Sequence, residues 1–310
     1  MSSRVQSFRP AATGAVTHGD GPVRGPDPEP PPPGGLLWND IGDIRTLITL
    51  APAFILQVAH PAVGAGVDDH SAFRTDPWGR GVRSMRSVLL WVYGGEQAVE
   101  EGRRLRALHR SITGADAHGR PYHALHARTY AWVHATGFPI SRYAHPYLWG
   151  RPFTPAEERR LYAEWRQVGQ ILGIPERELP LTVEAFWPYY HRVLAELEMT
   201  RVARELLDPD APLPVFDLGP RLLRVPVRAL WPVLRPLFLR LRRFLSIGLL
   251  PPEARAVLGL PWTPRQERGL SLLCKVVSTV VPRLPSRLRY FPSAHAARVR
   301  HGLARPRGNG

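Results

Sequence analysis

The chain has 310 residues, of which 44% are hydrophobic and 22% charged, so it has enough apolar side chains for a sizeable core. Its single cysteine, Cys274, excludes a disulfide framework, a cysteine-rich zinc site and a four-cysteine iron–sulfur cluster. The net charge of +15 belongs to the last third, because residues 218–310 hold 18 basic and two acidic side chains while residues 1–217 are nearly neutral.

The N-terminal region is rich in proline, glycine and charge, and we predict a disordered tail over residues 1–35. It contains no apolar run typical of a signal peptide, which favours a cytoplasmic protein. One helical domain is predicted over residues 36–300, and a second disordered tail, which is basic, over residues 301–310.

Residues 46–67 carry no charge, and this run of 22 residues is long enough for a membrane span. It also contains Pro52, the pair His60-Pro61 and two glycines, which interrupt a span. We therefore predict a buried helix over about residues 43–59 that ends at His60.

The later segments are also predicted to be helical. Thr154-Pro155-Ala156-Glu157 is typical of a helix start, with threonine as the N-cap, proline in the first position and glutamate in the third. Thr263-Pro264 repeats this arrangement, and sustained polar–apolar alternation typical of strands is missing. The fold class predicted is all-α, with helices over residues 93–112, 122–135, 154–172, 182–207 and 263–281.

Residues 218–250 combine seven arginines and no acidic residue with many leucines. Five of the arginines share one helical face, being 3, 4, 7 and 7 residues apart: Arg221, Arg224, Arg228, Arg235 and Arg242. Such a segment is typical either of helices that cover the core with arginine stems along it, or of a peripheral contact with an anionic membrane. Its prolines predict a break into short helices: Pro226, Pro232 and Pro236.

Several chemistries are excluded by motif. The sequence has no phosphate-binding loop, no dinucleotide fingerprint, no Gly-x-Ser-x-Gly elbow and no Glu-x-x-His pair for a carboxylate di-iron site. Cys274 lies in an apolar helix and is interpreted as a buried structural thiol. The chemistry that remains is that of histidine and arginine.

His109 is the strongest candidate among the histidines, because Leu105, Leu108 and Ile112 are predicted to project to the same side of its helix. A neutral imidazole on an apolar helical face is what an axial haem-iron ligand requires. Arg80 and Arg83 lie one helical turn apart and are suited to the two haem propionates, or simply to acidic partners such as Asp76. Histidines that only form hydrogen bonds in the core remain an alternative.

Five motifs in order resemble the rubber oxygenase family, which includes the latex clearing protein and the MpaB-type oxygenases. They are HPAVGAGVDDHSAFRTDP, RGVRS, LRALHRSITG, YHALHARTYAWVHAT and LLPPEARAVLGLPW, all within about residues 36–300. The resemblance implies a globin-like helical core that holds a non-covalent haem b through a helix histidine.

The resemblance also implies roles for individual residues. Arg80, Arg83 and Ser84 match the family's Arg-x-x-Lys-Thr near the haem, with arginine in place of lysine and serine in place of threonine. His109 best matches the axial ligand and His134 is the reserve ligand. The remaining motif positions assigned to the site are His60 and Tyr122 beside the cofactor and His70 beside the reacting groups.

The implied reaction is an O₂-dependent oxidation of an unsaturated, lipophilic substrate such as an isoprenoid or a secondary metabolite. The rival hypothesis is a non-catalytic basic protein that binds a membrane surface or nucleic acid through residues 218–310. Nucleic acid is not expected as a partner, because no recognition motif is present and aliphatic residues, rather than stacking aromatics, alternate with the arginines. The sequence does not indicate the electron donor.

Overall fold

The structure is a computed structural model that describes residues 28–214 and 221–304, with the backbone alone at residues 221–228. Most of the predicted N-terminal tail and residues 305–310 of the predicted C-terminal tail lie outside the described residues. Residues 28–35 of the predicted N-terminal tail are described. Among them Pro31 is buried, and the backbone N–H of Gly35 donates to the Pro32 carbonyl.

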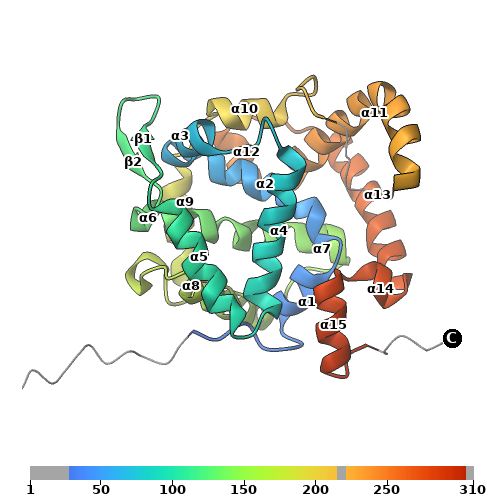
Figure 1. Ribbon diagram of the computed structural model, residues 1–310, viewed down its shortest axis with the longest axis horizontal. Helices are drawn as coiled ribbons and strands as arrows, with labels where there is room; N and C mark the ends of the chain where they lie inside the picture. The colour runs from blue at the N-terminus through green and yellow to red at the C-terminus, as the bar shows by residue number, and fades with distance from the viewer. Residues whose placement is uncertain (1–27, 215–220, 305–310) are drawn as a thin grey trace, which may run out of the picture.

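The described residues form an almost entirely helical molecule, which confirms the all-α prediction (Figure 1). The two strands form one short antiparallel hairpin in which Gly114 pairs with Tyr122. The elements are α1 (Leu36–Gly42), α2 (Thr46–Val58), α3 (Pro61–His70), α4 (Pro77–Tyr93), α5 (Gln97–His109), β1 (Thr113–Ala115), β2 (Pro121–His123), α6 (Ala127–Ala135), α7 (Gly137–Trp149), α8 (Pro155–Ile171), a 3₁₀ turn (Glu176–Glu178), α9 (Val183–Leu194), α10 (Arg201–Leu207), α11 (Arg221–Gly248), α12 (Pro252–Val257), α13 (Pro264–Val280), a second 3₁₀ turn (Val281–Arg283), α14 (Ser286–Arg289) and α15 (Pro292–Arg300).

The core is dominated by aromatic side chains from α6, α7, α8 and α9. The ring of Phe138 lies 5.0 Å from those of both Tyr162 and Phe186, and Trp132 stacks on Tyr190. All of them are buried. Such rings bring a large apolar area to the centre of the fold, and this core packs α6, α7, α8 and α9 together.

The two helix starts marked by Thr-Pro are confirmed. Thr154 and Glu157 form a reciprocal capping box at the start of α8, which ends at Ile171 before Gly173, whose φ is +67°. Thr263 forms the same box with Gln266, while Glu267 accepts hydrogen bonds from Trp262 and from Tyr147 on α7.

The uncharged run near the N-terminus forms two helices, α2 and α3, with the break where the sequence predicted it. The chain turns at His60, which is the N-cap of α3, and the two helices meet at 107°. None of the described helices is by itself both long and apolar enough to cross a bilayer, and only the bent α2–α3 pair reaches the length and composition together.

Three predicted helices are wrong in their extents. The helix predicted over residues 93–112 is only α5, because Gly94 and Gly95 form a turn and Gly95 has a φ of +57°. Tyr122 lies in β2, so the helix predicted to begin there begins at Ala127. The segment 182–207 is divided into α9 and α10, because the Thr200 hydroxyl caps α10.

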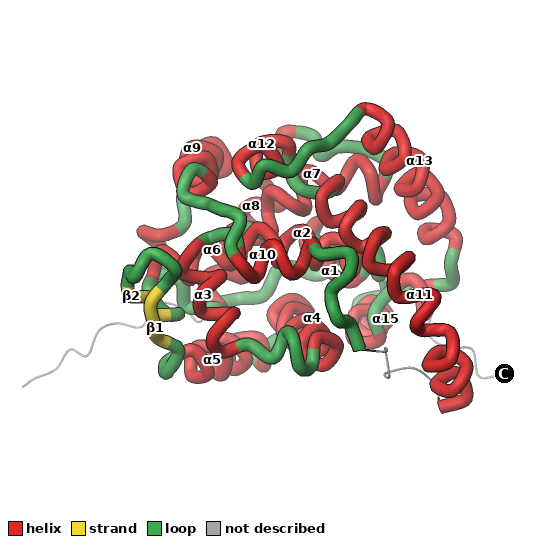
Figure 2. The backbone as a smooth tube through the Cα atoms, turned by 90° about the horizontal axis from the view of Figure 1, so that it is seen from above, coloured by secondary structure: helices red, strands yellow, loops and turns green. Residues whose placement is uncertain are grey.

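The predicted break of residues 218–250 into short helices is also wrong, since α11 is one helix of 28 residues. A proline removes its own N–H donor and bends a helix without cancelling the hydrogen bonds on the other faces. Pro232 and Pro236 lie one turn apart on the same side, so their effects fall on a single face. Figure 2 shows α11 as a long helix along the outer edge of the molecule.

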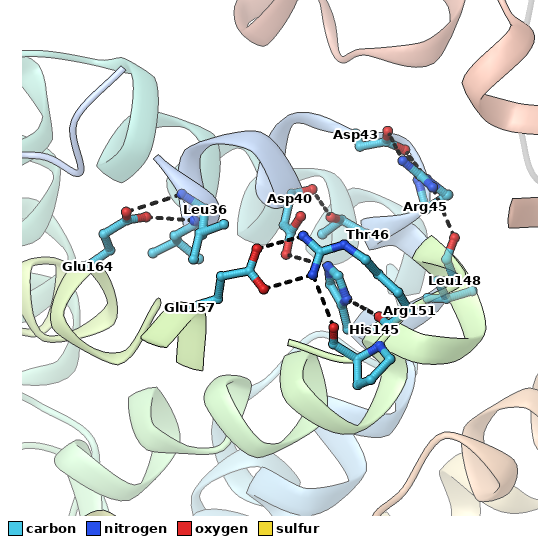
Figure 3. Close-up of polar contacts among 12 residues, drawn as sticks. Leu36, Asp40, Asp43, Arg45, Thr46, His145, Leu148, Arg151, Glu157 and Glu164 are labelled. Carbon is cyan, nitrogen blue, oxygen red and sulfur yellow. Dashed lines mark hydrogen bonds and ion pairs between the residues drawn. The ribbon is translucent and has the colours of Figure 1, made fainter. Parts of the chain in front are cut away.

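A polar network ties the first helix to α7 and α8 (Figure 3). The Glu164 carboxylate accepts the backbone N–H groups of Leu36 and Leu37 at the start of α1, at 3.1 and 2.7 Å. The fully buried Arg45 forms a two-pronged ion pair with Asp43. Because the unpaired N–H groups of a helix start need acceptors, Glu164 serves as a distant cap for α1.

Candidate functional site

Helices α4 and α5 place the main predicted site residues at one end of an antiparallel pair. The helices pack together near the Gly94–Gly95 turn and diverge away from it (Figure 1). Arg80 lies in the first turn of α4 and His109 is the last residue of α5, so both lie at the end remote from the turn.

The His109 ring has one defined tautomer. Its Nδ1 lies 2.7 Å from the carbonyl oxygen of Leu105, one helical turn earlier. A carbonyl oxygen only accepts, so Nδ1 carries the proton and Nε2 carries the lone pair of the neutral imidazole. This is the arrangement in which a metal-ligating histidine is oriented by a backbone carbonyl.

Tyr130 of α6 lies against this ring, with the two ring centroids 6.0 Å apart and edge to face. The Tyr130 hydroxyl is buried and has no hydrogen-bond partner among the described residues, and burial raises the pKa of the phenol to about 12. Leu105 packs against the core, whereas Leu108 is 56% exposed, so the prediction that Leu108 shares the apolar side of His109 is wrong.

Arg80 is half-buried between α4, α2 and the end of α3. Its Nε donates to the Ser71 hydroxyl at 3.0 Å, and its guanidinium lies 3.9 Å from the ring centre of Phe54. Burial, and secondarily Arg83, lowers the pKa of Arg80 to about 10. Within the described part of the chain no carboxylate pairs with Arg80, which is unusual for an arginine withdrawn from water.

Arg83 and Ser84 lie further along α4 and are both exposed. Arg83 donates to the Asp76 carboxylate at 2.8 Å, the acidic partner that the sequence offered as an alternative to a propionate. This ion pair lowers the pKa of Asp76, which also caps α4 by accepting the Gly79 N–H. Since exposed ion pairs contribute little stability, Arg83 is available for exchange to another anion.

The other predicted residues lie on both ends of α3 and on the hairpin beside it. His70 Nε2 contacts the Thr113 carbonyl of β1, and Tyr122 of β2 donates to Asp69 at 2.6 Å. These contacts fasten the C-terminal end of α3 to the hairpin. His60, at the start of α3, has a buried Nδ1 for which the described part of the chain offers no hydrogen-bond partner, and burial lowers the pKa of His60.

His134 lies in a separate, closed environment. Its Nε2 donates to the Trp165 carbonyl at 2.9 Å, its ring stacks on Trp165, and the Trp165 indole N–H donates back to the His134 carbonyl. Burial lowers the pKa of His134 to about 4. These reciprocal bonds hold α6 against α8, and with the proton on Nε2 the lone pair of the neutral ring lies on Nδ1.

The chemistry of the α4–α5 end fits a haem better than a metal bound by protein ligands alone. Among the described side chains, no three His, Cys, Asp or Glu residues gather as a metal site. A haem iron needs a single imidazole lone pair from the protein, and His109 supplies one. The two propionates need cations, and Arg80 lies at the same end of the helix pair without a carboxylate of its own.

Comparison with known proteins decides the family. The family model described as ER-bound oxygenase mpaB/B'/rubber oxygenase, catalytic domain, matches residues 38–279. The chain belongs to this family. It is therefore related to oxygenase catalytic domains, which supports an enzyme of the oxidoreductase class.

Two uncharacterised proteins, one from Mycobacterium tuberculosis and one from Mycobacterium bovis, are each 25% identical over 242 residues, which cover 76% of this chain and 89% of each relative. No solved structure matches the chain, so the globin-like arrangement of the helices stays a prediction.

Sequence reasoning missed two features of the site. Tyr130 appears in the YHALHARTYAWVHAT motif, but its position beside His109 depends on how α6 crosses α5. The Leu105 carbonyl is a backbone group four residues before His109, a spacing that is detectable once the helix is assumed.

Proposed function

We propose that this protein is a haem b-dependent oxygenase that uses O₂ to oxidise an unsaturated, lipophilic substrate. The observation that carries the proposal is the His109 imidazole, whose Nδ1–H donates to the Leu105 carbonyl and whose Nε2 lone pair is therefore free to bind iron. The oxygenase family of residues 38–279 supports the same reading. When bound, the haem supplies the activation of O₂.

His109 is proposed as the axial ligand. The Leu105 carbonyl holds the ring in one tautomer and, by accepting the Nδ1 proton, raises the basicity of Nε2. Tyr130 packs against the ring edge and limits its rotation. His109 therefore needs no rearrangement of α5 to act as a ligand.

Arg80 and Arg83 are proposed to hold the propionates. The Arg80 guanidinium is already partly withdrawn from water and contacts Ser71 and Phe54. Part of its desolvation penalty is therefore already included in the folded state, and a bound carboxylate would offset that penalty. Arg83 is exposed and would exchange Asp76 for the second propionate. Ser84 follows Arg83 and is proposed as a polar group beside the reacting oxygen.

The substrate class is proposed from the walls of this region. Leu105 and Tyr130 beside His109 belong to the aromatic core, and Phe54 lies against Arg80, so the side chains next to both residues are apolar. Such walls bind an alkene chain through buried apolar area, while polar groups are few and serve to orient it. A small isoprenoid or similar secondary metabolite fits this chemistry.

The visible spectrum of the protein expressed with a haem precursor tests the proposal. We expect a Soret band, equimolar haem b by extraction, and loss or a clear shift of the band in His109→Ala. His191→Ala is the matched control, because His191 is an exposed histidine on α9 outside the site, and it should retain the wild-type spectrum.

Two outcomes would overturn the assignment. Wild-type protein without any Soret band would reject haem, and an unaltered band in His109→Ala would move the ligand to another histidine. If haem binds, O₂ consumption with isoprenoid alkenes is expected to be lost in Arg80→Gln in proportion to its haem content.

A further inference from the structure

Helix α11 turns its apolar side outward. Six apolar residues that follow one another at intervals of three, one, three, one and three positions are all exposed, by 55%, 75%, 42%, 66%, 37% and 43%: Leu230, Val233, Leu234, Leu237, Phe238 and Leu241. At about 100° per residue this spacing forms one continuous stripe along the helix. We call these six residues the α11 stripe.

The opposite side of α11 faces the body of the protein. Leu239, about 200° around the helix from Leu237, is only 1% exposed. The Arg242 guanidinium donates to the Leu206 carbonyl of α10 at 2.8 Å, and the Trp231 indole N–H donates to the Leu213 carbonyl at 3.0 Å. These contacts fix the rotation of the helix, so the stripe cannot simply turn inward.

An ordinary surface helix buries its apolar side and exposes its polar one, whereas α11 exposes the apolar α11 stripe in addition to burying Leu239. Arg235 and Arg242 are partly buried, and the Nε atoms of both are withdrawn from solvent. With these two arginines turned toward the protein and the α11 stripe exposed, the outer surface of α11 is suited to an apolar partner.

The charges around the stripe identify the chemistry of that partner. Arg240 and Arg243 are exposed beside it, and residues 218–250 contain no acidic side chain. The neighbouring helix α13 also exposes Leu272, Val276 and Lys275. A second copy of the chain would bring a surface of the same positive sign, which opposes pairing, whereas an anionic lipid surface offers acyl chains for the stripe and phosphates for the arginines.

We propose that the α11 stripe is a docking surface for an anionic membrane, with α11 lying in the plane of the interface. Its 28 residues lie within the range typical of interfacial amphipathic helices. The inference stands without the haem. Where it also concerns the substrate it rests on the proposed function, because a lipophilic substrate concentrates in the membrane that the stripe contacts.

Sedimentation of the full-length protein with sonicated vesicles tests the proposal. Wild-type protein is expected to bind phosphatidylglycerol–phosphatidylcholine vesicles, to bind pure phosphatidylcholine much less, and to be released by salt. Val233→Gln/Leu237→Gln/Leu241→Gln is expected to weaken binding by at least about tenfold, since it removes three apolar anchors. Arg240→Gln/Arg243→Gln is expected to weaken binding by about fivefold for each arginine.

Leu181→Gln is the matched control, because Leu181 is 69% exposed but lies before α9, outside the stripe. It should bind vesicles as the wild type does. All variants are compared by circular dichroism, and since the replaced side chains are exposed, their helicity is expected to be unchanged. Vesicle binding needs no haem, so failure here and failure of the proposed function are separate results.

Three results would overturn the proposal. Equal binding by the wild type and the stripe triple variant would show that the stripe is not the contact. Equal binding to neutral and anionic vesicles would refute the charge argument. If the wild type forms a dimer and does not bind vesicles, and the triple variant is a monomer, the stripe would be assigned to contact with a second copy of this chain.

Discussion

Replacing Asp40 by asparagine tests whether a buried carboxyl group is neutral in the folded protein. Asp40 lies on α1 with 8% of its surface exposed, and its Oδ2 is buried with no hydrogen-bond partner within residues 28–214 and 229–304. His145 of α7 lies opposite, with Nε2 3.9 Å from that oxygen (Figure 3). His145 Nδ1 donates to the Arg151 carbonyl, so a lone pair faces the carboxyl group, and a neutral acid suits it better than a carboxylate.

Burial raises the pKa of Asp40 from 3.8 to about 8, and Asp43 and Glu164 add to the effect while Arg45 opposes it. The folded state therefore holds a proton that the unfolded state loses. The stability linked to this proton is complete below the unfolded pKa and is lost as the pH rises through about 8. The slope approaches about 1.4 kcal/mol per pH unit, so roughly 2 kcal/mol is lost between about pH 6.5 and 8.5.

Histidines act in the opposite direction at lower pH. Burial lowers the pKa of both His134 and His145 to about 4, so their contribution is lost as the pH falls from about 6.5 toward 4. Above about pH 6.5 this contribution is nearly constant. The comparison of wild type with Asp40→Asn is therefore made above about pH 6.5, where neither histidine adds a trend and the carboxyl group is isolated.

The assay is urea unfolding at a series of pH values, followed by tryptophan fluorescence. The free energy of unfolding of Asp40→Asn relative to wild type should rise by about 2 kcal/mol between about pH 6.5 and 8.5. Asp210→Asn, which removes an exposed carboxylate, is the control and should show no such trend. Parallel pH profiles for wild type and Asp40→Asn would refute a neutral Asp40.

Two further predictions concern packing and capping. Glu164→Gln should lower the free energy of unfolding by about 1–3 kcal/mol in the same urea assay, because one of the α1 N–H groups that the carboxylate accepts would lose its partner; an unchanged midpoint would contradict this. Gly102→Ala should lower the free energy of unfolding by about 1–3 kcal/mol, because the new Cβ would overlap the Ile171 carbonyl of α8. Gly81→Ala, on α4 with open space around it, is the control and should raise the free energy of unfolding by up to about 1 kcal/mol. Equal effects of the two substitutions would show that α5 and α8 are not in close contact.

Features decided within one or two turns of chain were predictable. Thr154 and Thr263 mark helix starts because their caps involve residues three positions away, and Cys274 is buried as its apolar helix indicated. The division between α9 and α10 was not predictable in this way. There the Glu198 N–H donates to the Ala59 carbonyl and the Thr200 hydroxyl to the Val58 carbonyl, which are partners about 140 residues distant.

In the candidate site, too, features set by nearby residues were predictable from the sequence and features set by distant residues were not. The family motifs indicated His109 and Arg80, and the short spacing between Asp76 and Arg83 indicated their ion pair. The enclosure of His134 by Trp165 is not a property of the motif, because it depends on how α6 packs against α8.

The orientation of α11 is the clearest case of information that a sequence does not contain. Its periodicity defines an apolar side and an arginine side, but both interpretations of residues 218–250 use the same periodicity. The rotation of the helix is set by Trp231 and Arg242, which donate to two backbone carbonyls of the preceding segment. Because withdrawing an arginine from water is unfavourable unless something compensates its desolvation, the partly buried Arg235 and Arg242, together with the exposed apolar stripe, are the observations on which the proposed membrane contact rests.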